Sequence, residues 1–246
     1  MAAGFRGIDT ANQRRHYHEA AVGDAIRKSG ESLFVQTKFT YVESQDHRLP
    51  YDPNAGYPTQ VRQSFESSIQ HLGHVDSYLL HGPRTHSGIS SIDREVWRTM
   101  EDLQREGRTS FIGISNVTAD QLAELCDIAS VRPAFVQNRC FARLGWDRDV
   151  RQVARREGVA YQGFSLLTAN VPELASPTVR GIAAAHDTNV TRVAFAFALA
   201  VGMICLTGTT SPEHMRDDLT ATELELSEVE IATIEEISER RLPAGR

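Results

Sequence analysis

The sequence contains only three cysteines, Cys126, Cys140 and Cys205, and none of them forms a CxxC pair. This scarcity excludes a disulfide-rich scaffold and cysteine-based zinc sites, and it indicates buried, reduced thiols. The sequence also lacks any run of roughly 18 apolar residues, which a membrane-spanning helix needs. Its N-terminus does not have the layout of a signal peptide. We therefore expect a soluble, cytoplasmic protein.

An excess of basic residues is also missing, because the net charge is −6 and residues of both signs are interspersed. This balance argues against a nucleic-acid-binding surface. Asp46, His47 and Asp52 lie close together, but their spacing matches no metal-ligand pattern. We expect a small-molecule partner, with no nucleic acid, membrane or metal, and nothing in the sequence predicts an oligomer.

What the sequence does contain is a regular alternation of short apolar strands and amphipathic helices. The predicted strands are 5–11, 33–40, 76–81, 110–115, 134–138, 159–166 and 203–207. The predicted helices are 19–29, 58–72, 92–106, 119–129, 148–157, 177–186 and 190–201, with one that begins at Pro212 and an extra C-terminal helix at about 227–240. Such βα units predict a parallel sheet that is buried on both faces.

Two α/β folds fit this pattern, a doubly wound sheet and a (β/α)8 TIM barrel. No GxGxxG follows the first strand, so the usual signature of a dinucleotide-binding doubly wound fold is absent. Reactive residues stand instead at many different strand ends, which favours the barrel. We expect residues 1–246 to form one barrel domain. Only seven strands are visible, so we also expect that the first βα unit is missing.

Four residues near strand ends are candidates for one shared site. Asp9 ends the first strand and Tyr17 follows it, while Lys38 and His81 end the next two strands. In a barrel these ends meet at one rim, where active sites are built. The long loop 41–56, together with Phe141 and Trp146, suggests an aromatic-lined pocket beside them.

Six short motifs, in order along the chain, resemble segments of the aldo-keto reductase family. They are GFRGIDTA at 4–11, VQTK at 35–38, LLHGP at 79–83, GISN at 113–116, FVQN at 135–138 and FSLL at 164–167. The resemblance covers essentially the whole chain, except that the family's N-terminal hairpin, first strand and first helix have no counterpart. It implies an NAD(P)H-dependent oxidoreductase that reduces a small aldehyde or ketone through an Asp–Tyr–Lys–His tetrad.

The tetrad assigns a role to each candidate. A phenol has an unperturbed pKa of about 10, and a nearby ammonium group lowers the pKa of a phenol, which favours proton donation. Tyr17 would be the general acid, Lys38 its cationic neighbour, Asp9 the partner of Lys38, and His81 the group that orients the carbonyl oxygen. The family usually has its tyrosine five residues after the aspartate, where this chain has Arg14, so His16 is an alternative acid.

The resemblance also implies a set of cofactor-binding residues. Hydroxyl and amide groups of Ser115, Asn116 and Gln137 suit the nicotinamide carboxamide, and Phe164 offers a face for stacking. The remaining candidates are Ser165, Leu167, Gly208, Thr209, Thr210, His214 and Asp218. The loop 208–211 enters a helix, which is a natural phosphate site.

Two questions stay open at this point. Gly208 and His214 stand where NADPH-dependent members generally carry Lys and Arg, so NADP(H) and NAD(H) are about equally expected. The main alternatives to an active enzyme are a non-catalytic, cofactor-binding or regulatory barrel and an inactive, N-terminally truncated fragment.

Overall fold

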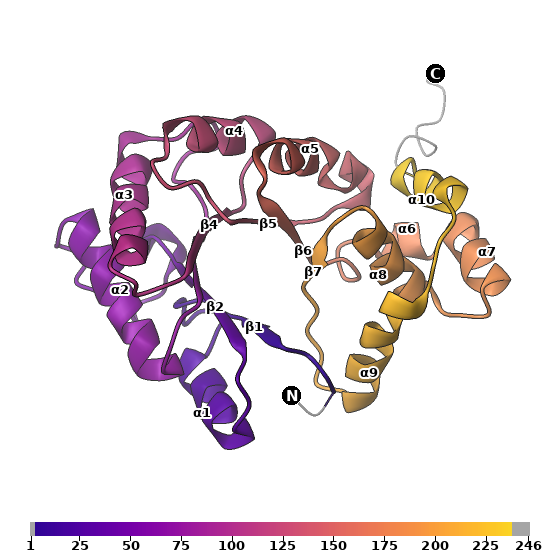
Figure 1. Cartoon of the computed structure of the whole chain (residues 1–246), viewed down its shortest axis with the longest axis horizontal. Helices are drawn as coiled ribbons and strands as arrows, with labels where there is room; N and C mark the ends of the chain where they lie inside the picture. The colour runs from indigo at the N-terminus through magenta and orange to yellow at the C-terminus, as the bar shows by residue number, and fades with distance from the viewer. Residues whose placement is uncertain (1–2, 238–246) are drawn as a thin grey trace. The chain divides into compact units, whose positions relative to one another are not determined.

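A computed structural model describes residues 3–237, which Figure 1 draws in colour. The chain divides into two compact units. The first unit comprises Phe5–Val136 and Arg156–Val159. The second comprises 3–4, Gln137–Arg155 and 160–237. The seven strands follow the order of the chain, β1 to β7, and every pair with a described register is parallel. Whether the chain is one domain stays a prediction.

The first unit contains four βα repeats. Its strands are β1 (Gly7–Asp9), β2 (Phe34–Phe39), β3 (Ser77–Leu80) and β4 (Phe111–Ser115). Its helices are α1 (Glu19–Ser29), α2 (Tyr57–Leu72), α3 (Ser91–Arg105) and α4 (Ala119–Ile128), with a 3-10 turn η1 (Val42–Ser44) in the long loop. Parallel pairing sets the carboxyl ends of these strands at one edge of the sheet, where loops carry reactive side chains.

Local sequence signals explain where these helices begin and how closely they pack. Capping boxes start two of them, with Ser90 and Asp93 at α3 and Thr118 and Gln121 at α4. Gly23 lets α1 approach α2, because a Cβ atom there would stand 1.9 Å from the carbonyl oxygen of His71. Any larger residue at position 23 would force the two helices apart.

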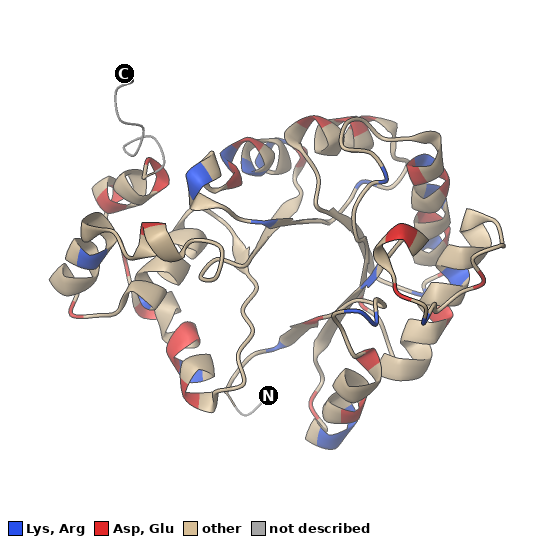
Figure 2. Ribbon diagram, turned by 180° about the vertical axis from the view of Figure 1, so that it is seen from behind, with Lys and Arg blue, Asp and Glu red and all other residues tan. Residues whose placement is uncertain are grey.

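The second unit contains β5 (Phe135–Arg139), which begins in the first unit, β6 (Ala160–Phe164) and β7 (Ile204–Cys205). Its helices are α5 (Arg148–Glu157), which ends in the first unit, α6 (Val171–Leu174), α7 (Pro177–Ala185), α8 (Val190–Ala200), α9 (Pro212–Thr220) and α10 (Glu228–Glu235), with 3-10 turns η2 (Ala142–Asp147) and η3 (Ala221–Glu223). The helices of both units carry charges of both signs (Figure 2).

The predicted strands and helices are confirmed, with differences of a few residues at their ends. The last part of the predicted helix 227–240, beyond residue 237, lies outside the described residues. The prediction missed α6, a single turn after β6. The prediction that Trp146 lines a pocket is wrong, because its ring is fully buried against Phe197 and its indole nitrogen donates to the carbonyl of Ile234. Among residues 3–237, no helix is long and apolar enough to cross a membrane.

Candidate active site

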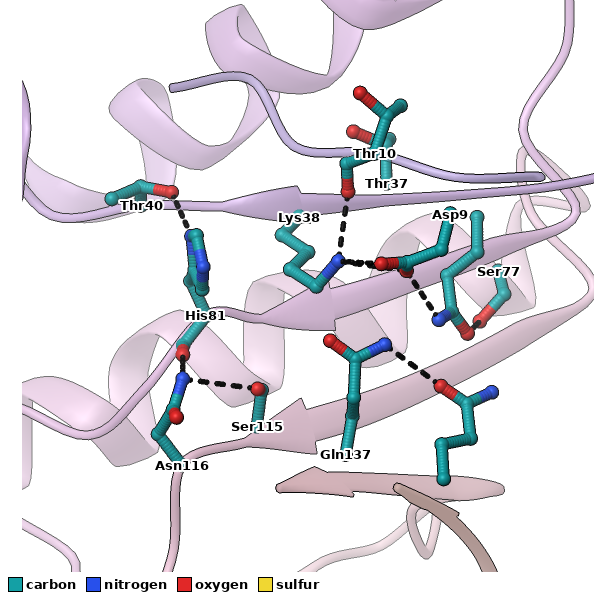
Figure 3. A network of polar contacts seen from close by, with 12 residues as sticks. Asp9, Thr10, Thr37, Lys38, Thr40, Ser77, His81, Ser115, Asn116 and Gln137 are labelled. Carbon is teal, nitrogen blue, oxygen red and sulfur yellow. Dashed lines mark hydrogen bonds and ion pairs between the residues drawn. The ribbon is translucent and has the colours of Figure 1, made fainter. Parts of the chain in front are cut away.

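A buried ion pair between Lys38 and Asp9 lies at the centre of the candidate site (Figure 3). The Lys38 ammonium is 2.7 and 2.8 Å from the two carboxylate oxygens of Asp9, and 2.8 Å from the carbonyl oxygen of Thr10. The Lys38 side chain is 1% exposed, whereas that of Asp9 is 21% exposed. Burial lowers the pKa of Lys38, and the charge and hydrogen bonds of Asp9 oppose that shift.

Strand periodicity explains how this pair is built. Gln36 pairs with Asp9 across β1 and β2, and Lys38 lies two residues further along, on the same face of β2. The Gln36 amide donates to Asp9 Oδ1 at 2.7 Å, and Ser77 Oγ donates to the amide oxygen of Gln36 at 2.9 Å. These bonds fix the orientation of the Asp9 carboxylate toward Lys38.

A second polar cluster packs on the opposite face of β2. Glu19, at the start of α1, is 4% exposed and accepts a hydrogen bond from Thr37 Oγ1, the residue between Gln36 and Lys38. Ser68 Oγ is 3.0 Å from its carboxylate and His71 Nδ1 is 3.1 Å from it. The negative charge of Glu19 also raises the pKa of Lys38, so it supports the ammonium form from behind the strand.

The ring of Tyr17 lies close to both basic residues of the site. The Lys38 ammonium is 5.8 Å from the centre of the Tyr17 ring, and the rings of Tyr17 and His81 meet edge to face at 6.0 Å. Tyr17 is half-buried, whereas His16 is exposed. The structure therefore brings Asp9, Tyr17, Lys38 and His81 together within the first unit.

Hydrogen bonds engage the backbone nitrogen, the carbonyl oxygen and one ring nitrogen of His81. Its backbone nitrogen donates to the carbonyl of Phe39 at 2.9 Å, and its carbonyl accepts from Asn116 Nδ2 at 2.8 Å. Its ring nitrogen Nδ1 is 2.7 Å from Thr40 Oγ1. Burial is the main cause that lowers the pKa of His81, to about 4. The positive charges of Lys38 and His16 lower this pKa further, whereas the negative charge of Asp9 opposes the shift. The imidazole is therefore neutral at physiological pH.

This lowered pKa predicts a pH-dependent loss of stability. In the unfolded chain His81 takes up a proton near pH 6.5, but in the folded chain only near pH 4. The unfolding free energy should therefore fall as the pH is lowered through this window, by up to about 3 kcal/mol from His81. Denaturant titrations at pH 7 and pH 4.5 would measure it, and His81→Gln should show a smaller fall. An equal fall in both proteins would contradict the assignment.

A cavity of about 530 Å³ opens beside His81 in the first unit. It is lined by polar side chains, among them Gln13, Glu43, Arg84, Asn116 and Gln121. Among the described residues 3–237, few of the expected aromatic rings line this cavity, because Tyr51 turns inward and donates to the carbonyl of Thr40 at 2.7 Å. A further ring of this loop, Tyr41, does reach the cavity wall, but its hydroxyl is bound to Asp93.

The predicted carboxamide-binding pair in the first unit lies at the end of β4, beside His81. Ser115 is 1% exposed, and Asn116 has a left-handed backbone with φ of 56°. The Asn116 amide donates to Ser115 Oγ at 3.1 Å as well as to the His81 carbonyl. The Asn116 side chain thus links Ser115 to the backbone of His81.

The other predicted cofactor residues belong to the second unit. The Gln137 amide donates to Gln162 Oε1 at 2.9 Å, and both side chains are buried. Phe164 is half-buried, with the Arg139 guanidinium 5.5 Å from its ring centre. Ser165 has a left-handed backbone with φ of 58°, and Leu167 is half-buried.

The loop after β7 leads into α9 as predicted. Ser211 caps this helix, with its hydroxyl accepting from the backbone of His214, and Thr209 Oγ1 accepts from the backbone of Ser211 at 3.1 Å. Gly208, Thr210 and His214 are exposed. Asp218 accepts from Thr207 Oγ1 at 2.7 Å, so its carboxylate is partly engaged by the strand end.

Gln36 and Thr40 are site residues that the sequence prediction missed. Gln36 lies on the same face of β2 as Lys38, and Thr40 continues this alternation just past the end of the strand; each is 2% exposed. A polar residue at every second position of a buried strand was the signal that could have identified them. Glu19 was predicted only as the start of the helix 19–29, and its burial depends on partners in β2 and α2.

Comparisons with known proteins agree on one family. A sequence model described as "Aldo/keto reductase family" matches residues 1–239. An uncharacterized oxidoreductase, YtbE, of Bacillus subtilis is 26% identical over 238 residues, which cover 96% of this chain and 80% of the relative.

Solved structures agree as well. An aldo/keto reductase from Brucella melitensis superposes with a TM-score of 0.80 at 26% identity, covering 96% of this chain and 86% of that one. A Bombyx mori aldo-keto reductase, crystallised in complex with NADP, shares the fold with a TM-score of 0.79 at 23% identity, covering 96% of this chain and 79% of that one.

Proposed function

This chain belongs to the aldo-keto reductase family, and we propose that it reduces a small aldehyde or ketone to an alcohol with NADPH or NADH. Membership confirms the resemblance that the motifs indicated, and it makes the chain an oxidoreductase. The similar solved structures confirm the predicted α/β fold class. The observation that carries the proposal is that the Tyr17 ring lies close to both a buried, carboxylate-paired ammonium group and a neutral imidazole.

Each residue of the site has a role in this reaction. Tyr17 gives its phenol proton to the oxygen of the carbonyl as negative charge develops there. The Lys38 ammonium stabilises the phenolate that remains, and Asp9 keeps that ammonium in place. His81, which is neutral, can donate a hydrogen bond to the same carbonyl oxygen. Gln36 supports Asp9 by a direct hydrogen bond, and Ser77 in turn holds Gln36.

The residues present fit a nicotinamide cofactor, which would supply the hydride when bound. Ser115, Asn116 and Gln137 provide hydroxyl and amide groups of the kind that a carboxamide needs. Pro212 has no N–H and the His214 N–H is bound to Ser211, so the N-terminus of α9 would attract a phosphate chiefly through the positive end of the helix dipole. The first unit supplies Ser115 and Asn116, and the second unit supplies Gln137 and α9.

Assays of the purified 246-residue chain test the proposal. We expect NADPH or NADH to be oxidised when aldehydes or ketones are added, one cofactor for each carbonyl reduced. Tight cofactor binding without turnover on a broad carbonyl panel would favour the second candidate, a non-catalytic cofactor-binding protein. The parental chain and Lys38→Met should be compared, because both retain the proposed cofactor-binding residues.

The second unit predicts weak discrimination between the two cofactors. Gly208 offers no cation for a 2′-phosphate, and the carboxylates of Asp217 and Asp218, a few residues later, would repel one. The exposed Arg216 partly offsets this repulsion with its positive charge. We expect the dissociation constants of NADH and NADPH to lie within roughly tenfold of each other. A ratio above about a hundredfold in favour of NADPH would contradict this prediction.

Gly208 also offers a way to change this preference. A Cβ atom at Gly208 would meet no atom within 4 Å, so a lysine side chain can be introduced there. We expect Gly208→Lys to shift the ratio of dissociation constants toward NADPH by about tenfold. Gly181→Lys, at an equally open position in α7, is the matched control for added charge and should leave the ratio unchanged.

A further inference from the structure

The contact between Thr40 and His81 holds the imidazole ring in place and also bears on which ring nitrogen carries the proton. Thr40 follows the last residue of β2, its side chain is 2% exposed, and its hydroxyl oxygen is 2.7 Å from His81 Nδ1. The other ring nitrogen, Nε2, is the one left to face a ligand in the cavity that both residues line. A neutral imidazole carries one proton, so the partner of Nδ1 decides what Nε2 can do.

We propose that Thr40 is a positioning residue that donates its hydroxyl proton to His81 Nδ1 and so holds the ring proton on Nε2. His81 then donates from Nε2 to the carbonyl oxygen of the substrate. In the opposite tautomer Nε2 would direct a lone pair at that oxygen and repel it. The catalytic part of this inference rests on the proposed reductase function, whereas the tautomer itself does not.

The direction of the hydrogen bond follows from what else the hydroxyl can reach. In the part of the chain that the structure describes, His81 is the only hydrogen-bond partner of Thr40 Oγ1. If the hydroxyl accepted a proton from Nδ1, its own O–H group would be buried without an acceptor. An unsatisfied buried donor costs more than an unused lone pair on a hydroxyl oxygen, so donation to Nδ1 is favoured.

The long loop gives Thr40 a fixed backbone. The carbonyl of Thr40 accepts from Tyr51 at 2.7 Å and from Gln45 at 3.4 Å, and the Tyr51 ring packs on Phe39 at 5.7 Å. The backbone of His81 is bound to the same segment through the carbonyl of Phe39. Because strand and loop hold both partners, the hydroxyl has little freedom to turn away from the imidazole.

The tautomer can be read directly by nitrogen NMR of protein labelled with 15N-histidine. The chain has nine histidines, and His81→Gln identifies the resonances of His81. At pH 7 we expect His81 in the parental protein to carry its proton on Nε2. Thr40→Val replaces the hydroxyl with a methyl group of the same shape, and we expect a mixture of the two tautomers. Thr40→Ser keeps the donor and should restore the parental pattern.

Kinetics then test the consequence. We expect kcat/KM to fall about tenfold in Thr40→Val, which is the effect of one hydrogen bond, and to recover in Thr40→Ser. The dissociation constant of the cofactor should not change. Thr99→Val, which removes a buried hydroxyl from α3, is the matched control and should leave both the tautomer and kcat/KM unchanged.

The two proposals can fail separately. A parental chain without reductase activity would refute the proposed function and leave the NMR result to decide on Thr40. The inference is overturned if His81 in Thr40→Val keeps a single Nε2–H tautomer, or if Thr40→Ser loses as much kcat/KM as Thr40→Val. Should Thr40→Val not melt cooperatively, Thr40→Ala removes the same hydroxyl, and the same two outcomes apply to it.

Discussion

Tyr17→Phe is expected to lower kcat for carbonyl reduction by about 100- to 10,000-fold, the usual contribution of a general acid. The change removes one hydroxyl from a half-buried ring, so packing against His81 should persist. The dissociation constant of the cofactor and the melting temperature should therefore stay close to the parental values. Single-turnover reduction, cofactor titration and thermal melting of the same preparation would measure the three quantities.

His16→Ala is the control for this experiment. His16 is exposed, and its positive form would lie close enough to His81 to lower the pKa of that imidazole. If Tyr17 is the acid, removing His16 should change kcat only a few-fold. Near-parental turnover in Tyr17→Phe together with a severe loss in His16→Ala would assign the proton to His16 instead.

The sequence predicted the strand-end residues well because strand ends follow from local patterns. An apolar strand that closes on a polar residue is visible in a few letters, as at Asp9, Lys38 and His81. In parallel strands such ends gather at one edge, so their proximity follows once the strands are assigned. The structure adds the distances, above all the 2.7 Å contact between Lys38 and Asp9.

Other parts of the site could not be predicted because they depend on partners far along the chain. Thr40 meets a side chain that is 41 residues away, and this contact depends on the register of β2 against β3. Trp146 looked like a pocket residue because a lone aromatic in a loop often is one. Its burial depends on α8 and α10, which are about 50 and 90 positions later in the sequence.

The second large effect concerns the stability contributed by the buried pair. Asp9→Asn would leave the Lys38 ammonium buried without its carboxylate, and we expect the unfolding free energy to fall by about 3 kcal/mol or more. Lys38→Met should cost less, because Asp9 is 21% exposed and keeps its hydrogen bond from Gln36. Chemical denaturation at pH 7 would measure both variants.

The double variant Asp9→Asn/Lys38→Met distinguishes the contribution of the pair to stability from its contribution to carbonyl reduction. In Asp9→Asn/Lys38→Met no unpaired charge remains, so the loss of stability should be smaller than the sum of the single losses by at least about 1 kcal/mol. Arg62→Met and Glu106→Gln form the matched control cycle in the same unit, because both of those side chains are more than 40% exposed and their coupling should be much weaker. The double variant should fold yet reduce no carbonyl, since Tyr17 would lack its cationic neighbour. Additive losses at Asp9 and Lys38 would show that their pairing does not stabilise the folded chain. Near-parental turnover of the double variant would show that the pair does not serve the proposed proton transfer.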